Sequence, residues 1–190
     1  MTASQTKQDE IRTSRLLLRR ANWDDLDDIH QVMSSPAAMR YWSRLPHASL
    51  DVTRKWFPSA LLDVDNPAMD EWVLEFEARA IGYMGIWKMP EFGFILNPDV
   101  WGKGLATEAA EAVIPYLFDR HDIAALTADV DPRNAASFRL LKKLGFAETG
   151  FARRTFLLGG EWCDSIFLAL PRPAFGRAAV PDTSTDEAIK

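Results

Sequence analysis

Residues 72–96 constrain the fold of this chain more than any other segment. Apolar residues there follow the two-residue period of β-strands through WVLEFE (72–77), IGYMGIWKM (81–89) and EFGFIL (91–96). Very short connections separate the three stretches, so each strand must turn straight back beside the one before it. The segment therefore predicts an antiparallel meander.

The residues after this meander change to the helical period. Leu105, Ala109 and Tyr116 recur at helical spacing, and Pro115 should kink or loosen the last turn of that helix. The stretch AALTADV (124–130) then predicts a buried strand. A strand–helix–strand unit of this kind pairs its two strands in parallel through a right-handed crossover.

Further strands and helices are predicted on either side of these segments. They are a strand over 15–20, a helix capped by Asn22, a helix from Ser49 with apolar residues Val52, Trp56 and Leu61 that Pro58 disturbs, a helix over 134–143 that Gly145 ends, and a hairpin of 151–158 and 161–170. The resulting order is β-α-α-β-β-β-α-β-α-β-β. It predicts a mixed α/β fold, with a mostly antiparallel sheet, one parallel strand pair and helices on both faces.

A chain of 190 residues is long enough for one domain with a buried core. Residues 1–12 and 172–190 are polar or rich in small residues, and we expect both segments to be disordered. Residues 13–171 carry all the predicted strands and helices and form the expected domain.

Composition excludes several classes of protein. The net charge of −5 argues against a general nucleic-acid binder, which needs a basic face. The chain shows neither an apolar run of membrane-spanning length nor a secretory signal, so we expect a cytoplasmic protein without a membrane partner. The single cysteine, Cys163, and three histidines without metal-ligand spacing indicate no metal site.

Two glycines flank a lysine just before the helix that starts near Leu105. A nucleoside-triphosphate loop needs Ser or Thr after Gly102-Lys103, where this chain has Gly104. The dinucleotide fingerprint needs a small residue at Thr107, so it fits poorly as well. The glycines alone leave two interpretations open, a tight turn or a nest of backbone amides that binds an anion.

Two motifs in sequence order resemble those of the GNAT N-acetyltransferase superfamily. WGKGLA (101–106) resembles its [QR]-x-x-G-x-[GA] loop, and DPRNAASFRLLKKLGF (131–146) is similar to its second signature. The spacing N-x-x-S-x-x-L-x-x-K-L-G-F is typical of the RimJ/RimL-like branch, the ribosomal-protein-alanine acetyltransferases. TSRLLLR near the start and GGEWCDSIFLAL near the end also resemble that branch, so the resemblance covers about residues 12–170.

The chain departs from the superfamily pattern at two positions. Trp101 stands where Gln or Arg is usual, a change that this branch often tolerates. Leu141 stands where many members have a tyrosine that protonates the departing thiolate. The resemblance therefore assigns no general acid to this chain.

The resemblance implies acetyl-CoA as co-substrate, with no metal. The pyrophosphate of acetyl-CoA is expected to bind the amides at the start of the helix, and its pantetheine arm to lie alongside EFGFIL. Asn134 is expected to contact the pantetheine arm, unless its side chain only caps its helix. The Lys103 side chain either assists in binding the pyrophosphate or is solvated. The cofactor-binding residues implied are Phe94, Ile95, Leu96, Trp101, Gly102, Lys103, Gly104, Leu105, Ala106, Thr107, Asn134 and Ser137.

The amine that attacks a thioester must first lose a proton. Glu91, at the start of the cofactor strand, is our candidate general base, although a charged residue after Pro90 is often merely solvated. His47 is an alternative base, and Arg40, Tyr41 and Trp42 are expected near the acceptor. A backbone amide near Ile95 or Leu96 is the expected oxyanion donor.

The sequence thus predicts an acetyl-CoA-dependent N-acetyltransferase that acts on a primary amine. A protein N-terminal amine is the first candidate acceptor, and a small amine such as an aminoglycoside, a polyamine or an amino acid is the second. A peptide requires an open groove between residues 36–48 and the last hairpin, and a small amine requires a closed acidic pocket. A non-catalytic acyl-CoA-binding module stays open, as does a homodimer.

Overall fold

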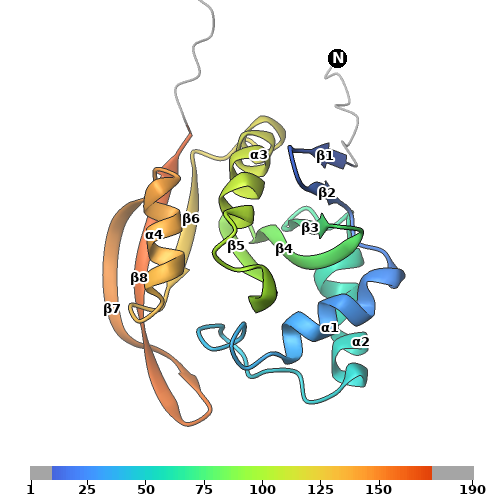
Figure 1. The fold of residues 1–190 in the computed structure, drawn as a ribbon. Helices are drawn as coiled ribbons and strands as arrows, with labels where there is room; N and C mark the ends of the chain where they lie inside the picture. The colour runs from blue at the N-terminus through green and yellow to red at the C-terminus, as the bar shows by residue number, and fades with distance from the viewer. Residues whose placement is uncertain (1–9, 173–190) are drawn as a thin grey trace, which may run out of the picture.

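The computed structural model describes residues 10–172. Its strands form one sheet with the order β1-β2-β3-β4-β5-β6-β8-β7, and helices pack on that sheet (Figure 1). The strands are β1 (Glu10–Arg12), β2 (Leu17–Arg19), β3 (Asp70–Phe76), β4 (Arg79–Lys88), β5 (Glu91–Leu96), β6 (Ala125–Val130), β7 (Ala147–Leu158) and β8 (Glu161–Pro171). The helices are α1 (Leu26–Ser34), α2 (Leu50–Phe57), α3 (Leu105–Arg120) and α4 (Ala135–Lys143), with short turns η1 (Trp23–Asp25), η2 (Pro58–Leu62) and η3 (Pro98–Val100).

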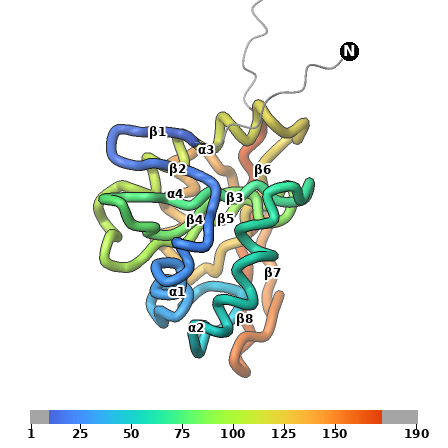
Figure 2. The backbone as a smooth tube through the Cα atoms, turned by 90° about the vertical axis from the view of Figure 1, so that its right-hand side faces the viewer, coloured from blue at the N-terminus to red at the C-terminus, as the bar shows by residue number. Residues whose placement is uncertain are grey.

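Strand alternation divides the apolar side chains between the two faces of the sheet. Val73, Tyr83 and Ile95 pack with the buried residues of α1 and α2. Their neighbours Trp72 and Phe92 pack on the other face, with the buried residues of α3 and α4. The views in Figures 1 and 2 show helices on both faces, so the predicted mixed α/β fold is confirmed.

The parallel pair of β5 and β6 is confirmed, but β5 pairs with β6 only at its first residue. Glu91 is in register with Thr127, and the Thr127 amide donates to the carbonyl of Pro90 at 3.1 Å. No later residue of β5 is in register with β6, although β5 runs on to Leu96 and β6 to Val130. The two strands therefore diverge, as Figure 1 shows.

Residues at both ends of the expected domain are more ordered than the sequence predicts. Residues 10–12, expected to be disordered, form β1 because they pair with β2 from Leu17 to Arg19. At the other end, the Arg172 amide donates to the carbonyl of Ala124 at 2.8 Å. The rest of the expected disorder, at residues 1–9 and 173–190, lies outside the described residues.

Two helices also differ in detail from the prediction. Helix α2 buries Thr53 and Phe57 and leaves Val52 43% exposed, so its buried face is shifted by one residue from the predicted one, whereas Leu61, in η2, is buried as predicted. Helix α3 continues past Pro115 to Arg120, where we expected a kink or a loosened last turn. Buried neighbours of Pro115, such as Ile114 and Leu117, hold the helix against the sheet.

Glu108, in the first turn of α3, joins that helix to the segment before β2. Its carboxylate accepts hydrogen bonds from the hydroxyls of Thr13 (2.5 Å) and Ser14 (2.9 Å) and from the amide (2.8 Å) and Nε (2.6 Å) of Arg15. Burial alone raises its pKa, but these donors outweigh burial and lower the pKa of Glu108 to about 2. The ionised carboxylate therefore stabilises the fold.

We predict that Glu108→Gln lowers the free energy of unfolding by about 1–2 kcal/mol at pH 7, because bonds to a charged acceptor are lost. Because the folded pKa lies below the ordinary value of 4.5, this contribution is present above pH 4.5 and is lost as the pH falls towards about 2. Denaturant unfolding at several pH values measures it. Glu111→Gln, at an exposed position of the same helix, is the control, and equal stability of the two variants at pH 7 contradicts the prediction.

Candidate active site

A cavity of about 650 Å³ opens where β5 and β6 diverge. Phe92 to Leu96 of β5 form one wall, and Ala128 to Asp131, on and just after β6, form the opposite wall. Residues of α3 and α4 line the cavity on one face of the sheet, and the segment after α1 lines it on the other. The cavity therefore extends to both faces of the sheet.

The turn between β5 and α3 lines one end of this cavity. Trp101 stabilises the turn, because its indole Nε1 donates to the carbonyl of Leu96 at 2.9 Å. Gly102 and Gly104 have φ angles of 74° and 77°, in the left-handed region that favours glycine. A Cβ atom on Gly102 would meet nothing within 4 Å, so backbone conformation, not lack of space, calls for glycine there.

Unpaired amides gather where this turn becomes α3. Glu108 is the first residue of this helix whose amide has a helical hydrogen-bond partner, because it donates to the carbonyl of Gly104 at 3.1 Å. The amides of Leu105, Ala106 and Thr107 precede it and lie at the positive end of the helix dipole. Such a group of amides can bind an anion without a metal ion and without a basic surface.

The sequence-predicted cofactor residues line this cavity, with one exception. Those that line it are Phe94, Ile95, Leu96, Trp101, Gly102, Gly104, Leu105, Ala106, Thr107, Asn134 and Ser137. Lys103 is exposed and does not line it; its carbonyl accepts a hydrogen bond from Arg15 Nη1 at 2.8 Å. The backbone of the turn, more than its lysine side chain, forms this end of the cavity.

Asn134 caps α4, since its Oδ1 accepts from the amide of Ser137 at 3.2 Å. Within the described residues, the NH₂ group of Asn134 donates to no protein acceptor, so it is available to a ligand. Leu141, from the same helix, also lines the cavity and is only 1% exposed. Its apolar side chain has no proton to transfer.

Two carboxyl groups lie on the α1 and α2 face of the diverging strands. Phe92 and Ala128 are buried towards α3 and α4, so Glu91 and Asp129, their neighbours, point to the opposite face. Glu91 lies where the strands still pair and does not line the cavity, whereas Asp129 lines it. Burial, and next the negative charge of Asp129, raise the pKa of Glu91, while a hydrogen bond with Trp87 opposes the shift.

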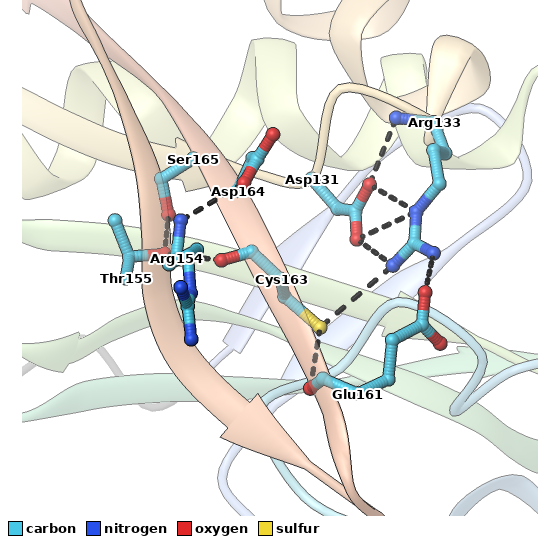
Figure 3. A network of polar contacts seen from close by, with 8 residues as sticks. All are labelled: Asp131, Arg133, Arg154, Thr155, Glu161, Cys163, Asp164 and Ser165. Carbon is cyan, nitrogen blue, oxygen red and sulfur yellow. Dashed lines mark hydrogen bonds and ion pairs between the residues drawn. The ribbon is translucent and has the colours of Figure 1, made fainter.

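Asp131, the third carboxyl near β6, is already paired. It is 5% exposed and accepts from Arg133 Nε at 2.9 Å and Nη2 at 2.6 Å, and Arg133 also bonds Glu161 (Figure 3). Burial by itself raises the pKa of Asp131, but the hydrogen bonds from Arg133 prevail and lower it. Asp131 and Arg133 thus form a fixed ion pair at the cavity wall.

Figure 3 also shows the polar side chains of the β7–β8 hairpin. Thr155 Oγ1 lies 2.8 Å from Ser165 Oγ and 3.1 Å from the carbonyl oxygen of Cys163. Asp164 Oδ1 accepts from the amide of Arg154 at 2.9 Å, where the strand register shifts. Asp164 therefore orients the hairpin, and Cys163 is buried.

Aromatic and basic residues line the cavity on the α1 and α2 face. The Tyr41 ring lies 5.2 Å from the guanidinium of Arg40 and 6.0 Å from that of Arg133. Trp42 also lines the cavity, as the sequence predicts for this acceptor region. His47 does not line it: His47 is buried, with Nδ1 2.9 Å from Thr53 Oγ1, and burial is the main cause that lowers its pKa.

Sequence reasoning missed Asp129, which lines the cavity, and Ser165, which contacts Asp129 from β8. Ser165 Oγ donates to Asp129 Oδ2 at 2.9 Å, although the two residues lie on different strands. Alternation along AALTADV could have found Asp129, because Leu126, Ala128 and Val130 are its buried positions and leave Asp129 on the other face. No sequence signal joins Ser165 to it.

Within residues 10–172, no group of three or more His, Cys, Asp or Glu side chains is placed to hold a metal ion. Over the same residues, no helix has the length and apolar character to cross a membrane.

Comparisons with known proteins agree with this architecture. Residues 15–147 match the family model described as an acetyltransferase (GNAT) domain. The uncharacterized N-acetyltransferase YnaD of Bacillus subtilis is 29% identical over 84% of this chain and 95% of its own length. The spermidine N(1)-acetyltransferase of Escherichia coli is 26% identical over 80% of this chain and 84% of its own.

Solved structures share the fold at lower identity. The acetyl transferase of Salmonella typhimurium that modifies the N-terminal serine of 50S ribosomal subunit protein L7/L12 superposes with a TM-score of 0.75. It is 18% identical and matches over 84% of this chain and 96% of its own. Because the family model spans more than half of the sequence, including the glycine turn and α4, this chain belongs to the GNAT acetyltransferase family.

Proposed function

We propose that this N-acetyltransferase transfers the acetyl group of acetyl-CoA directly to the primary amine of a protein N-terminus. The observation that carries the proposal is the cavity between β5 and β6. It joins an anion-binding turn, an unpaired strand edge and an approach from the opposite face of the sheet. Acetyl-CoA is the acyl donor of GNAT enzymes, and its pyrophosphate and its pantetheine arm each have a matching part of the cavity.

The anionic end of acetyl-CoA fits the turn before α3. Its pyrophosphate needs several hydrogen-bond donors, which the free amides of Leu105, Ala106 and Thr107 offer. The pantetheine arm carries amide groups, and β5 presents an unpaired backbone edge from Phe94 to Leu96 towards the cavity. An arm bound along that edge points its thioester towards the start of β5.

Glu91 is the proposed general base that converts the acceptor's ammonium to an amine. Its partial burial and its raised pKa support this role, since a base works best when its pKa lies near the working pH. Glu91 does not line the cavity, so it must act through a water molecule or at the acceptor's approach. A backbone amide near Ile95 or Leu96 is the proposed oxyanion donor.

Charge around the cavity favours an acceptor with a single amine. Arg40 lines the cavity, whereas Arg44, in the same segment, lies 6.0 Å from the Trp56 ring and does not line it. Neither arginine forms an ion pair within the described residues. Arg133 neutralises Asp131, so among the carboxylates of residues 10–172 that line the cavity, Asp129 is the one without a cationic partner. A polyamine with several positive charges matches such a surface poorly.

A small amine is the second candidate, because the relative from Escherichia coli is a spermidine acetyltransferase. The route to the cavity is also narrower than the open groove that a peptide is expected to need. A Cβ atom at Gly159, in the hairpin turn, would lie 3.4 Å from Leu45 Cδ2, so hairpin and segment 36–48 meet at their tips. A flexible N-terminus fits this route better than a folded surface.

A thiol-release assay with acetyl-CoA tests the acceptor. We expect faster release with N-terminal peptides, above all those with neutral or acidic residues after the amine, than with spermidine or an aminoglycoside. A clear preference for spermidine favours the second candidate. Tight binding of acetyl-CoA without release on any acceptor contradicts the proposed function.

The turn before α3 gives a matched pair of glycine variants. Gly102 and Gly160 both have positive φ angles, 74° and 90°, and a Cβ on either meets nothing within 4 Å. We predict that Gly102→Ala and Gly160→Ala each cost about 1 kcal/mol of stability through backbone strain. Only Gly102→Ala should also weaken acetyl-CoA binding, by about tenfold, because it displaces an amide from the phosphate. Titration calorimetry measures acetyl-CoA binding, and equal affinities of the two variants contradict the assignment of the phosphate to the turn before α3.

Replacement of Glu91 tests the base. We predict that Glu91→Gln lowers kcat by about 100-fold and leaves the acetyl-CoA dissociation constant nearly unchanged. In the unsubstituted enzyme the rate should fall as the pH drops through the raised pKa of Glu91, since only the ionised carboxylate accepts a proton. Glu148→Gln, at an exposed position of β7, is the control. Full activity of Glu91→Gln contradicts the prediction, because another group must then accept the proton of the ammonium.

A further inference from the structure

The proposed transfer releases coenzyme A as a thiolate, and the sulfur then needs a proton. The titratable side chains that line the cavity are Arg40, Tyr41, Asp129 and Asp131. Arginine does not give up its proton in proteins, and Asp131 is held ionised by Arg133. Asp129 and Tyr41 are the remaining groups that can carry the proton.

Asp129 has the better position for this task. It lies two residues past Thr127, the residue that pairs with Glu91 where the strands meet. The acetyl end of a ligand bound along β5 points towards this narrow end of the cavity. Asp129 also faces the α1 and α2 side, from which the acceptor enters.

Hydrogen atoms along a chain of side chains give a second, independent argument. Asp129 Oδ2, Ser165 Oγ, Thr155 Oγ1 and the Cys163 carbonyl oxygen lie in sequence, 2.9, 2.8 and 3.1 Å apart. Three hydrogen bonds along this chain need three hydrogens, but the Ser165 and Thr155 hydroxyls supply only two. When Asp129 is protonated, it supplies the third hydrogen and every contact is a hydrogen bond. When Asp129 is ionised, the Ser165 hydroxyl turns and donates to it.

The chain therefore accommodates both protonation states of Asp129. Ser165 is fully buried, at 0% exposure, so a carboxyl that changed its proton beside a fixed donor would leave a buried polar group unpaired. Here rotation of the Ser165 hydroxyl lets it donate to the ionised carboxylate or accept from the protonated one, while Thr155 still donates to the Cys163 carbonyl. This is a property expected of a group that takes up and releases a proton in each catalytic cycle.

We propose that Asp129 is a catalytic residue that carries the proton from the attacking amine to the departing sulfur. The amine nitrogen, already freed of its ammonium proton, bonds to the acetyl carbonyl carbon as the carbon–sulfur bond breaks. A second N–H proton passes to the Asp129 carboxylate and from there to the sulfur. The products are the amide and coenzyme A as a thiol, and Asp129 returns to its ionised form. Ser165 is a positioning residue.

The charges around Asp129 are consistent with this role. Glu91 of β5 lies near enough to feel the charge of Asp129, Asp131 acts on Asp129 from the segment after β6, and β7 and β8 present the Thr155 and Ser165 hydroxyls. Burial, and to a lesser extent the charge of Asp131, raise the pKa of Asp129, and the hydrogen bond from Ser165 opposes the shift. The inference rests on the proposed function, because it needs acetyl transfer to occur.

The test measures thiol release and acetyl-CoA binding for Asp129→Asn, Ser165→Ala and Tyr41→Phe across a pH series. We expect Asp129→Asn to lower kcat by about 100-fold or more with little change in acetyl-CoA affinity. Ser165→Ala should move the acid side of the pH profile to higher pH, because it removes a hydrogen bond that favours the ionised carboxylate. Asp119→Asn, at an exposed position of α3, is the control and should match the unsubstituted enzyme.

Two outcomes overturn this inference alone. One is an active Asp129→Asn variant with an unchanged pH profile, and the other is a loss of turnover in Tyr41→Phe with Asp129→Asn unaffected. Retained acetyl-CoA binding by Asp129→Asn shows that the variant is folded, so a slow rate cannot be assigned to unfolding. If the unsubstituted chain releases no thiol with any amine, the proposed function fails as well.

Discussion

The divergence of β5 and β6 is the constraint on which the rest of the structure depends. Two parallel strands that start in register and then separate leave backbone edges that cannot pair with each other. The sheet remains stable because β5 is paired with β4 and β6 with β8, each along most of its length. The opening between the strands is thus built into an otherwise well-paired sheet, and the turn before α3 lies at its wider end.

The wider end is held in place before any ligand arrives. Glu108 gathers four hydrogen bonds from the segment before β2, and Arg15 of that segment also bonds the carbonyl of Lys103 in the turn. Trp101 fixes the other side of the turn to the end of β5. An anion therefore meets amides that need no ordering, which spares binding an entropic cost.

Local pattern predicted most of the fold, because each element is specified by nearby residues. EFGFIL (91–96) became β5 with its predicted bounds, and Asn134 caps α4, which begins at Ala135. β1 was missed because its three residues form a strand only by pairing with β2. The candidate site divides in the same way: the glycine turn is visible in sequence, whereas the contact between Asp129 and Ser165 exists only after distant strands meet.

Because the cavity extends to both faces of the sheet, its two reagents need not share an entrance. Acetyl donor and amine can be bound at the same time, one from each side, and meet in the plane of the sheet. The proposed direct transfer requires this order of events: a complex of enzyme with both reagents forms before either product leaves. An acetylated enzyme as a separate stage is unnecessary, which agrees with the burial of Cys163 away from this meeting point.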